Sequence, residues 1–303
     1  MRDDSFFRGI RGPVGSGKSV ACSVEIFRRA MAQEPSPDGK RYTRFAVIRN
    51  TNPQLKTTTI KTWLDWFPED QFGRFNWSPP YTHHIRVADI DCEVIFLALD
   101  RPEEVRKLLS LELTGGFINE AREVSKTIVD GLTMRCGRYP SMAVGGPTWY
   151  GVWADTNAPD DDHWWPIMSS EAPLPEFITA EEALMLQLPD NWTFYTQPSG
   201  MLEKKDAKSG DVTGYIPNPK AENVENLHNT YYKTTITGKT KSWIDVYVMN
   251  RLGSLDDGKP VYPTFSPENH VSHDPLIISD KLPVYIGIDF GLTPAATFGQ
   301  RLS

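Results

Sequence analysis

One segment of the sequence has the residue types and spacing of a phosphate-binding loop. Residues 12–19 read GPVGSGKS and fit the pattern G-x-x-x-x-G-K-[ST] in full. Glycines allow successive backbone N–H groups to converge on phosphate oxygens, and the N-terminus of a following helix adds a favourable dipole. In this pattern Lys18 reaches the β- and γ-phosphates, and the hydroxyl of Ser19 ligates Mg²⁺. The expected nucleoside triphosphate site consists of Gly12, Pro13, Val14, Gly15, Ser16, Gly17, Lys18 and Ser19.

Hydrolysis of a bound triphosphate needs a second strand that delivers a carboxylate opposite this loop. The best candidate is residues 117–120, where Phe-Ile is followed by Asn119 and Glu120 at the expected carboxyl end of a strand. Glu120 is expected to polarise the attacking water as general base. Asn119 occupies the place of the usual aspartate that anchors Mg²⁺ through water, and an amide oxygen accepts from such a water without supplying charge. Two alternatives are a helix cap at Asn119 and Glu120, and a rival strand end at Asp100.

A third expected strand ends in Asp155, Thr156 and Asn157. A Thr/Asn pair at this position can hydrogen-bond the γ-phosphate or its water and relay the loss of the phosphate to the segment that follows. The alternative is a polar transition from strand to turn ahead of Pro159.

The elements that must position these residues alternate between strands and helices. Val20, Val24, Phe27 and Met31 recur at helical spacing and share one face of a helix after the loop. The expected strands span residues 6–11, 45–48, 115–120 and 152–157, a hairpin joins 85–87 to 93–99, and the expected helices span 20–31, 58–67, 102–113 and 124–134. A strand before the loop and a helix after it are the context that the motif requires, against the alternative of a glycine-rich turn that binds nothing. The alternation predicts an α/β fold with a parallel sheet.

The composition of the sequence changes beyond about residue 165. Prolines and loops dominate there, with extended runs such as residues 243–249. Residues 282–289 are one new strand that ends in Asp289, followed by Phe-Gly. A buried strand ending in Asp-x-Gly is how metal-dependent nucleases of the RNase H type begin, but two Mg²⁺ ions need several carboxylates and only one is present before Ser303.

Composition and charge set outer limits on these expectations. The 303 residues are 39% apolar and 23% charged, which is typical of a globular protein. The net charge is −7, yet residues 1–61 hold 12 Lys and Arg against 5 Asp and Glu, a distribution compatible with polyanion binding at one place. The three cysteines form no CxxC pair, which favours a reducing compartment. No apolar run reaches about 18 residues, so we expect an intracellular protein with neither a membrane span nor a secretory signal.

The order of these motifs resembles the large terminase subunit of tailed bacteriophages, the DNA-packaging motor. The matching segments extend over nearly the whole chain: GPVGSGKS after Arg8–Arg11, VIR at 47–49 before Asn50-Thr51, GGFINEARE at 115–123, DTNAPDDDHWW at 155–165, YTQPSG at 195–200, GKPVYPTF at 258–265 and YIGIDFG at 285–291.

The resemblance implies an additional-strand P-loop ATPase joined to an RNase H-like nuclease. Three regions follow from it: an ATPase core at 1–165, a completing and linking subdomain at 166–281, and the start of a nuclease domain at 282–303. It implies that the loop binds ATP and Mg²⁺, that Glu120 is the catalytic glutamate and that Thr156 and Asn157 form the coupling motif. It also implies that Asp289 is the first nuclease ligand for Mg²⁺ or Mn²⁺.

The implied setting is the host bacterial cytoplasm, at the procapsid. The partners are double-stranded DNA, the capsid portal protein, the small terminase subunit and further copies of the chain in a ring, with no membrane.

The sequence departs from the family pattern at three places. Asn119 replaces the usual aspartate, only about ten residues precede the phosphate-binding loop, and the nuclease domain stops after its first strand or two. We therefore expect an internal fragment with packaging ATPase chemistry and no nuclease competence of its own.

Several charged residues remain to be assigned. An arginine finger should complete the site, in cis or from a neighbouring subunit. Arg101 and Arg106 precede the Glu120 strand, and Arg135 and Arg138 follow it. For each of them taken singly a solvated helix arginine is favoured, and among the four Arg106 is the preferred candidate for the finger. Arg49, at a strand end, contacts either phosphate, DNA or a surface acid.

Two short segments could be considered for metal binding, His83-His84 and Asp160-Asp161-Asp162-His163, but neither has a spaced partner pair. Loop and helix-capping roles are favoured for them over metal binding. The alternative functions for the whole chain are another P-loop enzyme, such as a helicase or a nucleotide kinase, and a non-hydrolysing nucleotide switch, the last suggested by Asn119.

Overall fold

A computed structural model describes residues 3–175, 178–253, 277–289 and 295–301. The chain divides into two compact units, 1–255 and 256–303. Among the described residues, no helix has the length and apolarity that a membrane span requires.

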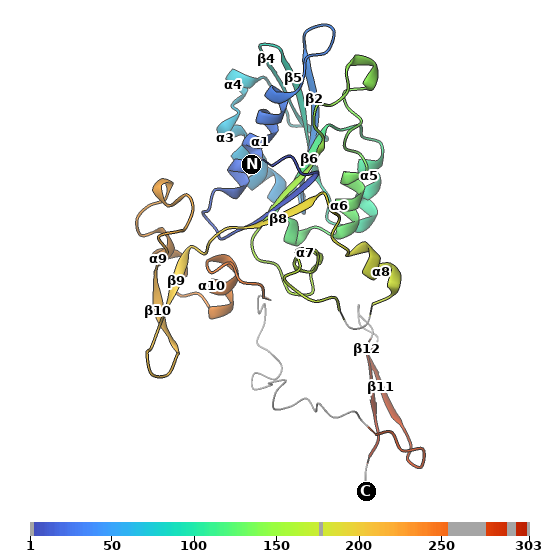
Figure 1. Cartoon of the computed structure of the whole chain (residues 1–303), viewed down its shortest axis with the longest axis vertical. Coiled ribbons are helices and arrows are strands. Elements are labelled where there is room, and N and C mark those ends of the chain that lie inside the picture. The colour runs from blue at the N-terminus through green and yellow to red at the C-terminus, as the bar shows by residue number, and fades with distance from the viewer. Residues whose placement is uncertain (1–2, 176–177, 254–276, 290–294, 302–303) are drawn as a thin grey trace. The chain divides into compact units, whose positions relative to one another are not determined.

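The first unit is organised around an eight-stranded sheet with the order β3-β4-β5-β2-β6-β7-β1-β8 (Figure 1). Five neighbouring pairs are parallel, from β5 through β2, β6, β7 and β1 to β8, whereas β3 and β4 add an antiparallel edge. The strands are β1 (Phe7–Arg11), β2 (Arg41–Arg49), β3 (Phe75–Asn76), β4 (Tyr81–Val87), β5 (Ile90–Ala98), β6 (Gly115–Asn119), β7 (Gly151–Thr156) and β8 (Trp192–Thr196). The predicted α/β fold is confirmed, and β7 is the additional strand between β1 and β6.

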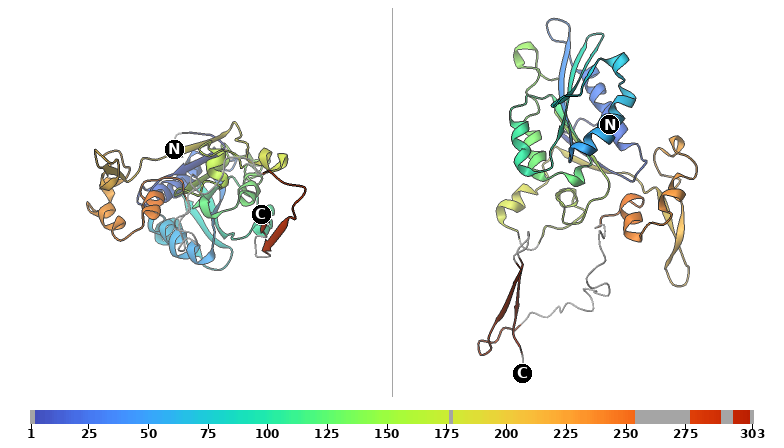
Figure 2. Two further views of the ribbon diagram at one scale, coloured as in Figure 1. Left: turned by 90° about the horizontal axis from the view of Figure 1, so that it is seen from below. Right: turned by 180° about the vertical axis from the view of Figure 1, so that it is seen from behind.

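Helices cover both faces of this sheet (Figure 2). One face packs against α1 (Lys18–Ala32), the π-helical η1 (Leu55–Ile60) and α3 (Lys61–Trp66), with α2 (Asn52–Gln54) and α4 (Glu69–Phe72) beside them. The other face packs against η2 (Pro102–Val105), α5 (Arg106–Leu109), η3 (Ala121–Glu123), α6 (Lys126–Thr133) and α7 (Trp164–Met168). Because β6 and β7 are covered on both sides, all of their residues are buried.

The strand before the loop and the helix after it form as predicted, as β1 and α1. The most buried residues of α1 are not the apolar ones noted in the sequence. Cys22, Ile26 and Ala30 are fully buried, whereas Val24 and Met31 are 39% and 49% exposed. Glu25 is buried as well, because Arg8, Arg28 and Arg29 neutralise its carboxylate. The face that Val20, Val24, Phe27 and Met31 share is therefore not the most buried face of α1, since ion pairing allows polar residues into the interface with the sheet.

Beyond β8 the chain forms a smaller cluster of elements within the same unit. These are β9 (Met201–Lys205) and β10 (Val212–Pro217), which pair antiparallel, η5 (Val224–Asn226), α9 (Tyr231–Ile236) and α10 (Lys241–Tyr247). Two further short elements are η4 (Met142–Val144) and α8 (Ala180–Met185). The run 243–249, expected to be extended, lies largely in α10, where Ile244 packs with Met201 and Val248.

In the second unit, β11 (Tyr285–Asp289) pairs antiparallel with β12 (Ala295–Gly299). The strand predicted at residues 282–289 is thus present and ends at Asp289. The side chain of Asp289 lies outside the described part of the structure, and so do residues 258–265 of the terminase-like pattern.

Candidate nucleotide-binding and hydrolysis site

The phosphate-binding loop connects β1 to α1 and depends on two glycines. Gly15 and Gly17 have φ angles of 76° and 80°, in the left-handed region that other residues enter at a cost. A Cβ at Gly15 would also approach the ring of Tyr231 to 2.8 Å. The loop conformation and its close packing therefore require glycine at this position.

Lys18 is buried at the first residue of α1. Its ammonium donates to the carbonyls of Gly12 and Pro13 at 2.9 and 2.8 Å, and to the side-chain oxygen of Asn157 at 3.3 Å. Burial lowers the pKa of Lys18, and the acidic groups of Glu120 and Asp155 oppose that shift. The lysine thus lies between the loop and the ends of β6 and β7.

Glu120 follows β6 directly and has an unusual backbone. Its φ and ψ of 58° and 61° are left-handed, a conformation that costs a residue with a Cβ about 1–2 kcal/mol. The side chain of Asp155 accepts the Glu120 backbone N–H at 3.0 Å and so holds this conformation. Burial and the neighbouring Asp155 raise the pKa of Glu120, while Lys18 and Arg49 act in the opposite direction. A strained acid with a raised pKa is typical of an active-site base.

The structure adds Asp155 to the site, a residue that the sequence marked only as part of a polar strand end. Asp155 is fully buried. One carboxylate oxygen accepts from the Ser19 hydroxyl at 2.5 Å, and the other accepts from the side-chain amide of Asn119 at 2.9 Å. Asn119 in turn accepts from the Thr59 hydroxyl at 2.7 Å. The only sequence signal was the position of Asp155 at a strand end.

Thr156 and Asn157 lie within the same network. The Thr156 hydroxyl accepts the backbone N–H of Arg122 at 3.1 Å, and the Thr156 backbone carbonyl accepts the backbone N–H of Gly12 at 3.1 Å. The Asn157 amide nitrogen donates to both carboxylate oxygens of Glu120 at 3.3 and 3.4 Å. Asn157 therefore bridges Lys18 of the loop and Glu120 of the neighbouring strand.

The expected arginine finger is not brought to this site by the described contacts. Arg106 is exposed at the start of α5, on the sheet face opposite α1, and Arg101 is exposed as well. Arg135 donates to the carbonyl of Leu111 at 2.7 Å. Arg49 pairs with Glu123 at 2.8 Å, which is the acid-contact alternative for that residue. The role of Arg106 stays a prediction.

His83 and His163 make hydrogen bonds that support the fold. His83 accepts from the Trp63 indole at 2.8 Å and faces the carbonyl of Gly73 at 2.7 Å, so that both ring nitrogens are occupied. His163 caps α7 by accepting the backbone N–H of Trp165 at 3.2 Å. In the described part of the chain, no three His, Cys, Asp or Glu side chains gather as a metal site.

Segments after β8 also contact the loop, which the sequence analysis did not foresee. Gln197 donates to the carbonyl of Ser16 at 3.4 Å, Asn223 donates to that of Gly15 at 2.8 Å, and the Tyr232 hydroxyl donates to that of Val14 at 3.0 Å. Nothing in the local sequence pattern signals these contacts, because each one spans about 180 to 220 residues of chain.

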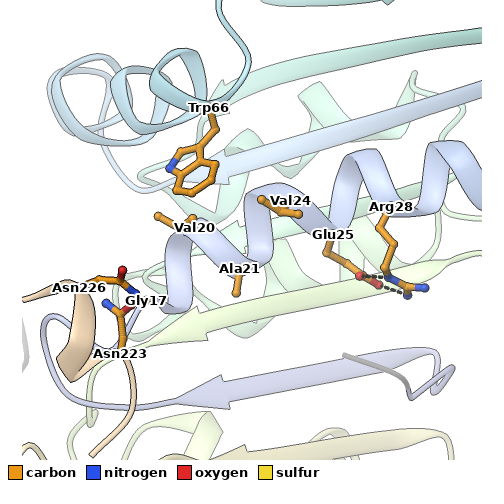
Figure 3. Close-up of a pocket in the computed structure, with 9 residues that line it drawn as sticks. All are labelled: Gly17, Val20, Ala21, Val24, Glu25, Arg28, Trp66, Asn223 and Asn226. Atoms are coloured by element: carbon orange, nitrogen blue, oxygen red, sulfur yellow. Dashed lines mark hydrogen bonds and ion pairs between the residues drawn. The ribbon is translucent and has the colours of Figure 1, made fainter. Parts of the chain in front are cut away.

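An open groove runs along α1 from the loop (Figure 3). Its volume is about 570 Å³. Trp66 of α3 lies over Val20 and Val24, Asn223 and Asn226 stand beside Gly17, and the ion pair of Glu25 with Arg28 lies at the far end. The groove thus combines an apolar, aromatic wall with amide groups next to the phosphate-binding loop.

The mixed α/β fold of this chain is shared by solved structures of a large terminase. The large terminase of a thermophilic bacteriophage, solved in complex with ADP, has a TM-score of 0.57 at 15% identity, covering 98% of this chain and 60% of that one. The same terminase in complex with ATP-gamma-S gives 0.55 at 14% identity, covering 98% and 59%. The large terminase ATPase domain of a Thermus phage gives 0.46 at 12% identity, covering 83% and 90%.

This likeness is one of fold. The chain has the architecture of large terminases and spans about 60% of the length of the terminase from the thermophilic phage. At the level of sequence, no protein-family model and no curated protein matches it.

Proposed function

We propose that this chain is the ATPase part of a phage DNA-packaging motor, which hydrolyses Mg²⁺-bound ATP to move double-stranded DNA. The observation that carries the proposal is the bridge from Lys18 through Asn157 to Glu120, next to the contact between Ser19 and Asp155. This arrangement joins a phosphate-binding group, a candidate base and a candidate sensor at the ends of three adjacent parallel strands. The terminase fold and the order of the sequence motifs point to the same function.

Each part of the network has a role in this proposal. The backbone of residues 12–19 and the Lys18 ammonium bind the phosphates, and the Glu120 carboxylate orients the attacking water and takes its proton. Mg²⁺, when bound with the nucleotide, neutralises phosphate charge; the oxygens of Ser19 and Asp155 are ligands of the kind it prefers. Asn157 contacts both Lys18 and Glu120, so it can report loss of the γ-phosphate to Thr156 and the chain beyond.

The groove along α1 is the proposed seat of the nucleobase. It adjoins Gly17, and its wall holds the Trp66 indole, which is 54% exposed and available for stacking. Base–aromatic stacking contributes about 1–3 kcal/mol. The amides of Asn223 and Asn226 supply polar groups for the edge of a base.

The motor role brings further proposals that follow from the resemblance to large terminases. The partners are double-stranded DNA, the portal protein, the small terminase subunit and neighbouring copies in a ring, in the host cytoplasm at the procapsid. Arg106, which is exposed, is the proposed arginine finger, in cis or for a neighbouring subunit. Asp289 is the proposed first metal ligand of a nuclease in a longer protein; there Asp289→Ala should abolish Mg²⁺- or Mn²⁺-dependent cleavage and spare ATP hydrolysis.

The decisive experiment measures ATP turnover with and without double-stranded DNA and procapsids. Glu120→Gln should lower turnover by about 10²–10⁴-fold and leave ATP binding intact, because the general base contributes that much to rate. Glu112→Gln, an exposed glutamate before β6, is the matched control and should behave as wild type.

The other outcomes separate the alternative functions. Turnover that does not depend on Glu120 would refute the assignment of the base. Binding of Mg²⁺-ATP without turnover would favour the nucleotide switch, and turnover stimulated by DNA but not by procapsids would favour a helicase.

A further inference from the structure

The residue that departs most from the terminase pattern, Asn119, has a specific neighbour in the sheet. Strands β6 and β7 pair in parallel, and their register places Asn119 directly beside Asp155. The residues two positions earlier, Phe117 and Trp153, stack with ring centroids 6.4 Å apart on the side of the sheet that faces α1. Because side chains alternate along a strand, Asn119 and Asp155 project from the same face.

The pair therefore contains one amide and one carboxylate at adjacent positions. The Asn119 amide donates to one oxygen of Asp155 at 2.9 Å, and the other oxygen of Asp155 accepts from Ser19 at 2.5 Å. Strand β7 lies between β1 and β6, so Asp155 is one strand nearer to the phosphate-binding loop than Asn119. The acidic group at this site has the hydroxyl of Ser19 as its direct partner.

We infer that Asp155, on β7, is the carboxylate that holds the magnesium ion of the bound nucleotide, in place of an acid at position 119. The inference rests on the proposed nucleotide site and assigns a further residue to it. The donor set fits Mg²⁺, which is held by one or two carboxylates together with substrate phosphates. Asn119 is then the hydrogen-bond donor that orients this carboxylate, as the partners of metal ligands commonly do.

The same geometry explains why position 119 is an amide. An aspartate there would place two carboxylates side by side, where one of the two could not remain charged without a cation. Asn119 supplies an N–H group instead and leaves a single carboxylate beside Ser19. The two positions are thus a matched pair, and their chemistry can be exchanged between the strands.

The test compares ATP affinity in Mg²⁺ with ATP affinity in EDTA, using isothermal titration calorimetry on the whole chain. In EDTA, Asp155→Asn should bind ATP with an affinity within about twofold of wild type. The factor by which Mg²⁺ increases the affinity for ATP should be about 10–100-fold smaller in the variant than in wild type. Electron paramagnetic resonance with Mn²⁺ and ATP should show the same loss of bound metal. Asp130→Asn on α6 is the control, because this acid pairs with Lys126 instead.

The exchange variant Asn119→Asp/Asp155→Asn should recover part of the Mg²⁺ gain. The single variant Asn119→Asp should have a lower thermal unfolding temperature than wild type in EDTA. Mg²⁺-ATP should raise the unfolding temperature of this variant by more than it raises that of wild type. This measurement tests the inference even if Asp155→Asn does not fold.

Three outcomes would overturn the inference. If Mg²⁺ increased the ATP affinity of Asp155→Asn as much as that of wild type, the metal would be held elsewhere. If Asp155→Asn lost the same factor of ATP affinity in Mg²⁺ and in EDTA, Asp155 would only support the loop. Failure of the wild-type chain to bind ATP in either condition would refute the nucleotide site itself, which distinguishes failure of the proposed function from failure of this assignment.

Discussion

The two sides of the phosphate-binding loop are built in different ways. On the side of β6 and β7, Asp155, Asn119 and Lys18 are buried; Asn119 donates to Asp155, and Lys18 donates to Asn157 at the end of β7, so the strand ends hold these groups in place. On the side of α1 and α3, Trp66 and Val24 line an open groove. The chemical groups are therefore held in place by the sheet, whereas the wall proposed for the base contributes little to the fold.

Two tryptophans test this comparison most strongly, and the buried one should show the larger effect. Trp153 of β7 is 1% exposed, stacks with Phe117 and donates from its indole to the carbonyl of Cys22 at 3.0 Å. Trp153→Ala should lower the free energy of unfolding by about 3–5 kcal/mol, because it leaves a cavity beneath the site and removes the indole hydrogen bond. Urea denaturation measures this loss, and Trp153→Phe should lose less. A loss below about 1 kcal/mol would show that this side is not rigidly packed.

The exposed tryptophan should show the reverse pattern. Trp66→Ala should weaken ATP binding about tenfold, or about 1.4 kcal/mol, and change the free energy of unfolding by less than about 0.5 kcal/mol. Calorimetric titration with ATP measures the first effect. Trp77, 52% exposed and near Phe75, is the matched control, and Trp77→Ala should leave ATP affinity unchanged. If Trp66→Ala destabilised the fold as much as Trp153→Ala, the contrast between the two sides would fail.

The sequence predicted the parts of the site that depend on local pattern. The loop motif required a strand before it and a helix after it, and both are present as β1 and α1. The ends of β6 and β7 also lie near their expected positions, because buried strands ending in polar residues are recognisable without knowledge of their partners. These strand ends contain Glu120 and Asn157, which the structure brings together.

What the sequence did not predict depends on register and on distant packing. The role of Asp155 follows from its pairing with Asn119, and a single sequence holds no signal for which strands are neighbours. The apolar spacing of α1 did not indicate which of its residues pack on the sheet, because ion pairing buries Glu25 while Val24 lies exposed in the groove. Residues 243–249 have the β-branched and aromatic composition of a strand, but most of them lie in α10, because tertiary packing outweighs the local preference.

The smallest predicted effect concerns pH on the side of β6 and β7, where His163 caps α7 and the next residue, Trp164, packs in one cluster with Ile118 and Ala154. Burial, aided by nearby Arg122, lowers the pKa of His163 to about 4, below its value of about 6.5 in an unfolded chain. The unfolded state therefore binds more protons between these values, so stability is fully present above about pH 6.5 and falls as the pH drops toward 4. Between pH 7.5 and 5.5, the wild type should lose about 1 kcal/mol of unfolding free energy relative to His163→Asn.

Asparagine is the appropriate replacement for this measurement because its side chain can still accept the Trp165 backbone N–H at the start of α7. Loss of the cap is thereby avoided, and the groups that titrate in both proteins cancel in the difference. Urea denaturation at the two pH values gives the four free energies required. Parallel pH dependence in the two proteins would mean that His163 accepts a proton in the folded state as readily as in the unfolded chain, and that water reaches its ring where the structure places packed side chains.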